Sequence, residues 1–349
     1  MILRATAAAA KAHPYHLVSY SDSRFVSYHP WRDTAALQDG ATSSVHSIGT
    51  QAVVWRPGFP LTALLLTVVS LVSACSPPHP NHPVIGAKNF TEQVILGELL
   101  AQEIEARSGL KVERRFYLAG SYIAQQALAA GRIDAYVEYT GTALTAILKQ
   151  PVDTDPAAVL ATVTRLYRER YNVEVAPPLG FENTFAMVIR GADAQRLGIQ
   201  TLSQATPYAP KWRLGVGYEF EERPDGLRGL SAAYGLSFNG SPRTMDLGLL
   251  YRALNANQVD MVAGNSTDGP IKAFGLAALA DDRHYFPPYQ AVPLVREEAL
   301  RRWPQMRAAL EALAGKISAE EMQAMNNAVD GEHRDPAEVV RGFRAKNGL

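Results

Sequence analysis

The chain of 349 residues contains a single cysteine, Cys75, which lies two small residues after its only long apolar run, residues 61–72. That run is shorter than the roughly 20 apolar residues that a membrane-spanning helix needs. Because no second cysteine is available, the chain can form no internal disulfide bond. We therefore expect a large apolar core to stabilise the domain or domains that follow Cys75.

The tetrapeptide at residues 72–75, Val-Ser-Ala-Cys, resembles a lipobox, in which the cysteine is lipidated and becomes the mature N-terminus. We therefore interpret residues 53–74 as a lipoprotein signal peptide and 75–83 as a proline-rich tether. The alternative is a buried core cysteine beside a core helix, and the four prolines between 77 and 83 favour the tether. Residues 1–52 show no sustained periodicity, and we interpret them as an extension from a mis-assigned start, with translation beginning near Val53 or Val54.

The charges of the chain balance, with 34 basic and 34 acidic residues. A nucleic-acid-binding protein needs a clustered basic face, so this balance argues against such a partner. The length that remains after residue 75 suits one large domain or two medium ones.

From residue 84 onward, short β-like runs alternate with helical stretches, which is the pattern of an α/β protein. In the helix expected over residues 91–106, Thr91 is a plausible N-cap and Gly109 a stop. The first series comprises strands at 83–86, 112–117 and 133–139 and helices at 91–106 and 122–130; the second comprises strands at 212–216 and 259–263 and helices at 226–234 and 247–257.

The two series contain a short internal match. An Ala-Leu pair precedes Asp134 in the first series, and an Ala-Leu pair precedes Asp260 at the same spacing in the second. Each aspartate follows a β-branched residue at the start of a predicted strand, and a glycine or threonine follows at the same offset, Gly141 and Thr267. The repetition indicates two related lobes rather than one long sheet.

Polar and aromatic residues gather where the predicted strands end. In open α/β sheets the ligand lies outside the carboxyl ends of the strands, and helix N-termini there favour an anion. We therefore expect the lobes to face each other across a cleft that holds a small carboxylate-bearing molecule with aromatic surface beside it. The residues at these ends are 88–90, 138–142, 218–222 and 265–267.

Six short blocks, in chain order, are similar to one family, the glycine betaine/choline/carnitine (osmoprotectant) substrate-binding proteins of ABC importers. The blocks are KNFTEQ (88–93), EYTGT (138–142), GFENTFA (180–186), RPDG (223–226), STDG (266–269) and FPPY (286–289). The resemblance implies an α/β, two-lobed type II periplasmic-binding-protein fold with two crossovers between the lobes. It places lobe 1 at 84–184 and 289–349 and lobe 2 at 185–288.

The resemblance also implies a set of ligand-binding positions. A quaternary ammonium cannot donate hydrogen bonds and is held by aromatic faces, whereas a carboxylate needs Arg, Lys, hydroxyl or N–H donors. Phe185 and Asn265 depart from the tyrosine usual in the family, and Asn265 removes one wall of the aromatic cage. The implied carboxylate-side residues are Lys88, Thr142 and Arg223, and the implied cage residues are Tyr139, Phe185, Asn265 and Tyr289.

Each of these positions has a structural alternative. Lys88 and Arg223 could be solvated surface residues, and Thr142 could cap a helix. The aromatic residues Tyr139, Tyr289 and Phe185 could pack in the hinge or the core. Asn265 could lie at the cleft without touching ligand.

Enzyme signatures are missing from the sequence. It has no Gly-x-Ser-x-Gly motif and no Walker loop, and from residue 84 onward it has no His or Cys pair at metal-ligand spacing, so we expect no catalysis, cofactor or metal. We expect a monomeric, lipid-anchored extracytoplasmic receptor that delivers glycine betaine or a related osmoprotectant to an ABC permease and its ATPase. The alternatives are a receptor for another zwitterion or amino-acid derivative, or a signalling or scaffold lipoprotein that has lost transport.

Overall fold

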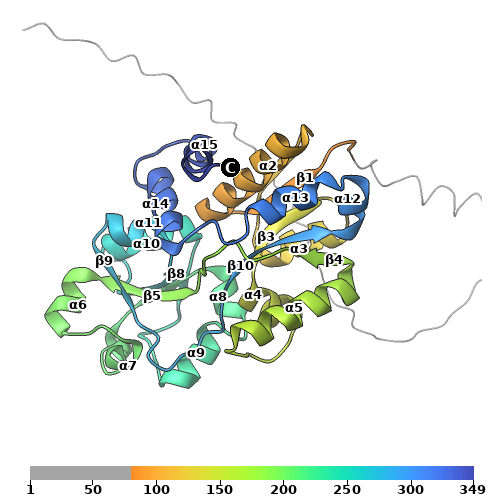
Figure 1. The fold of residues 1–349 in the computed structure, drawn as a ribbon. Helices are drawn as coiled ribbons and strands as arrows, with labels where there is room; N and C mark the ends of the chain where they lie inside the picture. The colour runs from red at the N-terminus through yellow and green to blue at the C-terminus, as the bar shows by residue number, and fades with distance from the viewer. Residues whose placement is uncertain (1–79) are drawn as a thin grey trace, which may run out of the picture. The chain divides into compact units, whose positions relative to one another are not determined.

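The computed structural model describes residues 80–349, and these contain two five-stranded sheets (Figure 1). The expectations for the N-terminal extension, the signal peptide, Cys75 and most of the tether fall on residues 1–79 and lie outside the described part. Within residues 80–349, no helix combines the length and the apolar character that crossing a membrane requires.

The first sheet has the strand order β2-β1-β3-β10-β4. Strands β1, β2 and β3 run parallel, and β10 runs antiparallel to both β3 and β4. The strands are β1 (Val84–Lys88), β2 (Glu113–Leu118), β3 (Ala135–Tyr139), β4 (Val173–Val175) and β10 (Ala291–Arg296). The intervening helices are α2 (Thr91–Ser108), α3 (Ser121–Ala129), α4 (Thr140–Thr142) with the π-helical turn η1 (Ala143–Ile147), and α5 (Pro156–Tyr171).

The second sheet has the order β7-β6-β8-β5-β9, which repeats the arrangement of the first. Strands β6, β7 and β8 are parallel, and β5 is antiparallel to β8 and β9. The strands are β5 (Phe185–Arg190), β6 (Leu214–Val216), β7 (Arg243–Thr244), β8 (Met261–Asn265) and β9 (Leu276–Leu279). The helices are α6 (Gly191–Leu197), α7 (Leu202–Ala205), the 3₁₀ turn η2 (Ala209–Lys211), α8 (Tyr218–Glu222), α9 (Leu227–Tyr234), α10 (Leu247–Asn255) and α11 (Gly269–Ala273).

The two aspartates of the internal match accept equivalent backbone hydrogen bonds in the two sheets. Asp134 Oδ2 accepts a hydrogen bond from the backbone N–H of Val84 at 2.9 Å, where β1 begins. Asp260 Oδ2 accepts one from the backbone N–H of Arg213 at 2.9 Å, next to β6. Each aspartate also pairs with the arginine that ends the antiparallel neighbour strand, Arg296 of β10 or Arg190 of β5. The predicted repeat is therefore confirmed as a structural equivalence.

Two segments connect the sheets, residues 176–184 and 280–290. After the second, the chain returns to the first sheet through β10 and ends in α12 (Glu297–Arg302), α13 (Gln305–Ala312), α14 (Ala319–Asp330) and α15 (Pro336–Asn347). Helices α13, α14 and α15 pack against α2, and α14 also packs against α11 beside the second sheet (Figure 1). All strands of each sheet fall within the lobe predicted for them, while the exact lobe boundaries stay a prediction.

Apolar cores lie on both faces of each sheet. Ile95, Leu99 and Leu100 of α2 are fully buried on one face of the first sheet, and Val159 and Val163 of α5 are buried on the other. The second sheet has equivalent clusters on its two faces. The apolar core expected of a chain without disulfide bonds is thus present, and each lobe has its own.

The predicted elements are present, with ends shifted by one or two residues. One detail of the prediction is wrong: Thr91 does not cap α2, because the N-cap is Phe90, and the Thr91 hydroxyl donates instead to Asp330 Oδ1 at 2.5 Å. Gly109 does end this helix, in the left-handed conformation at φ 69° that glycine adopts without strain.

Candidate functional site: a cleft between the two sheets

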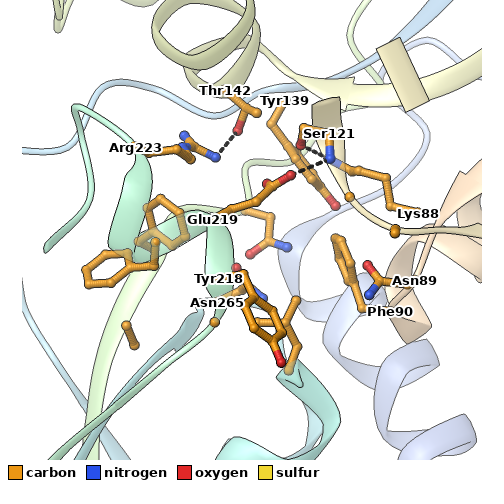
Figure 2. Close-up of a pocket in the computed structure, with 18 of the residues that line it drawn as sticks. Lys88, Asn89, Phe90, Ser121, Tyr139, Thr142, Tyr218, Glu219, Arg223 and Asn265 are labelled. Carbon is orange, nitrogen blue, oxygen red and sulfur yellow. Dashed lines mark hydrogen bonds between the residues drawn. The ribbon is translucent and has the colours of Figure 1, made fainter. Parts of the chain in front are cut away.

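A cavity of about 100 Å³ lies where the carboxyl ends of the parallel strands of both sheets meet (Figure 2). Elements of both sheets contribute to its walls, as expected for a ligand site of an α/β protein. All seven predicted ligand-binding residues line it: Lys88, Tyr139, Thr142, Phe185, Arg223, Asn265 and Tyr289.

The strands place most of these side chains directly. Lys88 ends β1, Tyr139 ends β3, and Asn265 ends β8. Phe185 begins β5, which runs antiparallel, so that it pairs with Asn265 at the same edge of the second sheet. The remaining three lie in short segments beside the strand ends: Thr142 in α4, Arg223 directly after α8, and Tyr289 in the segment that returns to β10.

Arg223 is 4% exposed, so it is not the surface residue that the sequence allowed. Its Nε and Nη2 donate to the carboxylate of Asp225 at 2.9 and 2.6 Å, and its Nη1 donates to Thr142 Oγ1 at 2.9 Å. The last bond joins the two lobes. Burial raises the pKa of Asp225, but the adjacent guanidinium outweighs this effect and holds the pKa below its ordinary value, so the ion pair is charged.

Two aromatic rings lie against the same guanidinium. The Arg223 guanidinium carbon is 4.7 Å from the ring centre of Phe185 and 5.8 Å from that of Tyr289. The Tyr289 hydroxyl donates to Asp225 Oδ2 at 2.5 Å, which fixes the ring beside the ion pair. Both rings therefore support the arginine as well as line the cleft.

Lys88 is 3% exposed and forms an ion pair with the buried Glu138, with Nζ 2.6 Å from Oε1. The same ammonium donates to Ser121 Oγ at 3.2 Å and lies 4.7 Å from the ring centre of Tyr139. The solvated alternative for Lys88 is therefore wrong. The Lys88 ammonium is therefore paired with Glu138 and oriented by Ser121 at the wall of the cleft.

Tyr139 is held by a carboxylate that sequence reasoning did not single out, Glu92 near the start of α2. The Tyr139 hydroxyl donates to Glu92 Oε1 at 2.6 Å, and Asn183, Thr267 and Asn326 donate to the same carboxylate at 2.9, 2.5 and 2.9 Å. These donors come from the first sheet, a connecting segment, the second lobe and α14. Burial raises the pKa of Glu92 even though its four hydrogen bonds oppose that shift.

Asn265 is held by a second acidic residue, Asp268. Its backbone N–H and its Nδ2 donate to Asp268 Oδ2 at 3.0 and 3.1 Å, and the Tyr251 hydroxyl donates to the same oxygen at 2.6 Å. Asn265 thus lines the cleft, and its hydrogen bonds to Asp268 fix its orientation. In the sequence analysis Asp268 appeared only as part of the STDG block at 266–269.

Glu219 of α8 also lines the cleft and was predicted only as part of the strand-end segment 218–222. Its Oε1 accepts a hydrogen bond from the backbone N–H of Ser121 at 2.5 Å, at the N-terminus of α3 in the opposite lobe. Figure 2 shows Glu219 between Arg223 and Thr142 on one side and Phe90, Tyr218 and Asn265 on the other. Glu219 therefore adds a carboxylate to the wall of the cleft.

Residues 83–346 match the family model for the substrate-binding domain of ABC-type glycine betaine transport systems. The chain belongs to this family. Its members are substrate-binding components of transporters, and such components of ABC importers work outside the cytoplasm. The predicted role as the solute receptor of an ABC importer is therefore confirmed.

Two similar proteins and one solved structure support this assignment. The carnitine transport binding protein OpuCC of Listeria monocytogenes is 35% identical over 293 residues, covering 82% of this chain and 95% of its own length. The glycine-betaine-binding protein of Pseudomonas aeruginosa PAO1 is 35% identical over 275 residues, covering 76% and 88%. A solved glycine betaine/carnitine/choline ABC transporter protein superposes with a TM-score of 0.65 at 33% identity, covering 76% and 98%. The fold is thus the type II periplasmic-binding-protein fold, as predicted.

Proposed function

We propose that the cleft binds glycine betaine or a related quaternary-ammonium zwitterion and that Arg223 and Thr142 hold its carboxylate. The observation that carries this proposal is the 2.9 Å hydrogen bond from Arg223 Nη1 to Thr142 Oγ1 across the cleft. A carboxylate bound to both residues touches both lobes at once. Ligand binding and lobe closure are then the same event, which is the hinge motion expected of such receptors.

The donors left on this pair suit a carboxylate. A guanidinium has five N–H groups, and within residues 80–349 three of them have partners, in Asp225 and Thr142. The Thr142 hydroxyl accepts from Arg223 and keeps its own hydrogen for donation. The pair therefore offers both guanidinium and hydroxyl donors, and charge-assisted bonds of this kind are among the stronger hydrogen bonds in proteins.

The cationic end of the ligand is proposed to lie on the other side of the cleft. Phe90, Tyr139 and Tyr218 line the cavity and supply aromatic faces, while Glu219 supplies negative charge. A quaternary ammonium binds to such faces without hydrogen bonds. The relatives named for carnitine and glycine betaine support a ligand of this class.

We extend the proposal to the cellular setting. Cys75 is lipidated, the described residues face the outside of the membrane on the tether 75–83, and the protein works as a monomer without cofactor, metal or catalysis. Its partner is a permease with a separate ATPase. Replacement of Cys75 by Ser should leave folding unchanged but release the processed protein from the membrane fraction, because the lipid is the anchor. Retention of the processed variant in membranes would contradict the lipobox.

A signalling role is the second candidate. The chemotactic signal transduction substrate-binding protein CosB of Halobacterium salinarum is 25% identical over 266 residues, covering 70% of this chain. Both roles need the same ligand-binding cleft, and they differ in the partner that reads the closed state. Uptake of labelled ligand by cells with and without the gene separates them.

Calorimetric titration of the purified full chain with glycine betaine, carnitine and choline tests the ligand class. We expect the two zwitterions to bind more tightly than choline, because choline has no carboxylate for Arg223 and Thr142. Binding of none of the three, or preference for choline, would contradict the proposal.

A further inference from the structure

Asn265 lies between two cavities and is oriented by a carboxylate. It lines the ligand cleft and an adjoining cavity of about 220 Å³ between α2, α10 and α14. Its Nδ2 lies 3.1 and 3.4 Å from the two carboxylate oxygens of Asp268. The other contacts of Asp268, with Tyr251 and with the Asn265 backbone N–H, are also donated to it.

This arrangement decides which end of the amide is free. An ionised carboxylate only accepts hydrogen bonds, so it holds the NH₂ group of the Asn265 amide. The carbonyl oxygen Oδ1 remains, and no donor within residues 80–349 reaches it. Burial raises the pKa of Asp268 to about 7, so the carboxylate is ionised at pH 8. At that pH the side chain has a hydrogen-bond acceptor that is unpaired among the described residues, at a position where a tyrosine is usual in the family.

The neighbours of Asn265 on the second lobe share this character. Glu219 and Asp246 line the same cleft, and their carboxylates accept from the backbone N–H groups of Ser121 and Gly248. A carboxylate has about four acceptor positions, so each keeps capacity for a further donor. The first lobe thus contributes the rings of Phe90 and Tyr139 to the cleft, and the second lobe contributes these acceptors beside its own rings, Phe185, Tyr218 and Phe220.

We propose that Asn265 determines specificity by accepting a hydrogen bond from the ligand, and that the preferred ligand carries an N–H or O–H donor on or beside its cationic end. The inference rests on the proposed function, because it places a zwitterion in this cleft; an O–H donor keeps the ligand in the quaternary-ammonium class, and an N–H donor makes it a tertiary ammonium. A fully methylated ammonium without a hydroxyl group leaves the Asn265 carbonyl without a partner when the lobes close. A polar group left without a partner on burial lowers affinity by roughly 5- to 150-fold.

Two pairs of ligands test this inference by calorimetry on the purified full chain at pH 8. Dimethylglycine and glycine betaine differ by one N–H replaced with N–CH₃, and carnitine and γ-butyrobetaine differ by one hydroxyl group. We expect the wild type to prefer the donor-bearing member of at least one pair by roughly tenfold or more. The pair that is discriminated shows whether the donor is on the nitrogen or beside it.

The Asn265→Leu variant, of nearly the same size, should abolish that preference by weakening the donor-bearing ligand. Asn265→Ala is the second variant in case Leu impairs folding. Leu247→Ala is the matched control, because Leu247 lines the same two cavities without a polar group and its truncation should affect both members of a pair equally.

The outcomes separate the two claims. Equal binding within both pairs by the wild type, or a preference that survives in Asn265→Leu and Asn265→Ala, would overturn the role of Asn265 and leave the proposed function standing. Failure of all four ligands to bind would overturn the proposed function and this inference with it.

Discussion

The two sheets share a scaffold but differ at the ends of their central strands. Asp134 and Asp260 accept the same backbone hydrogen bond in the two lobes, and the strands β3 and β8 follow them at the same spacing. Five residues after each aspartate, the first lobe places Tyr139 in the cleft and the second places Asn265. The two lobes thus share the aspartate that orders the sheet but differ in the residue that lines the ligand cleft.

The supports behind these two residues differ in the same way. Tyr139 donates its hydroxyl to Glu92, which leaves an aromatic face toward the cleft. Asn265 donates its amide to Asp268, which leaves a carbonyl oxygen. A buried acid stands behind each residue, and the side chain in front of it decides whether the wall is aromatic or polar.

The largest effect is expected where the lobes meet. Arg223→Ala should weaken the binding of glycine betaine by about 2–5 kcal/mol and change the binding of choline little, because only the zwitterion has a carboxylate for the guanidinium. Calorimetry with both ligands measures the difference. Equal losses for the two ligands would mean that Arg223 only holds the lobes together.

This variant needs a control, since removal of Arg223 leaves the buried Asp225 without its ion-pair partner. Thr142→Val keeps the ion pair and the side-chain shape but removes the hydroxyl from the other lobe. It should weaken glycine betaine by about 0.5–3 kcal/mol without comparable loss of thermal stability. Unchanged affinity in a folded Thr142→Val variant would remove Thr142 from the carboxylate site.

Matched substitutions of the two aspartates test whether their equivalent hydrogen bonds contribute equally to stability. Asp134→Asn should lower the free energy of unfolding by about 1–3 kcal/mol, because this side chain is 1% exposed and loses a charged acceptor of a backbone N–H. Asp260→Asn should cost less, because its side chain is 18% exposed and water replaces part of the loss. Urea denaturation of both variants checks the order, and a larger loss for Asp260→Asn would contradict it.

A substitution at position 265 can make the two strand ends alike, with a tyrosine on each. Asn265→Tyr restores an aromatic wall and should tighten glycine betaine by about 0.5–2 kcal/mol, provided that the ring fits beside Asp268. The same variant should weaken a ligand that uses the Asn265 carbonyl. Calorimetry on both ligand types measures the exchange; weaker glycine betaine binding by a folded variant would show that position 265 is not a cage wall.

The smallest effect concerns acid stability. The hydrogen bonds from Arg213 hold the pKa of Asp260 below its ordinary value, at about 2. The stabilising contribution of a carboxylate with a lowered pKa is present above its unfolded-state pKa and is lost as pH falls through the folded one. Between pH 4 and pH 2 the wild type should therefore lose slightly more stability than Asp260→Asn. Parallel pH profiles in thermal unfolding would contradict this.

Much of the fold could be predicted because it depends on local patterns. The spacing of apolar residues in residues 91–106 and the glycine at 109 locate α2, and the match around Asp134 and Asp260 indicates two lobes. The N-cap of α2 was mispredicted because Thr91 has a partner, Asp330, that is distant in the sequence.

The site could be predicted only as a set of positions. All seven residues line the cleft, but the partners that define their chemistry lie far along the chain. Glu92 accepts one of its four hydrogen bonds from Asn326, and Arg223 donates to Thr142. Lys88 is paired with Glu138 of a neighbouring strand. Such pairings follow from tertiary packing, which a pattern of residue types does not encode.

The most direct test of the central claim is a crystal structure of the protein with glycine betaine bound. We predict that the ligand carboxylate lies within hydrogen-bond distance of both Arg223 Nη1 and Thr142 Oγ1, with its methyl groups toward Phe90 and Tyr139. A carboxylate bound instead at the Ser121 N–H, in the place that Glu219 now occupies, would contradict the account.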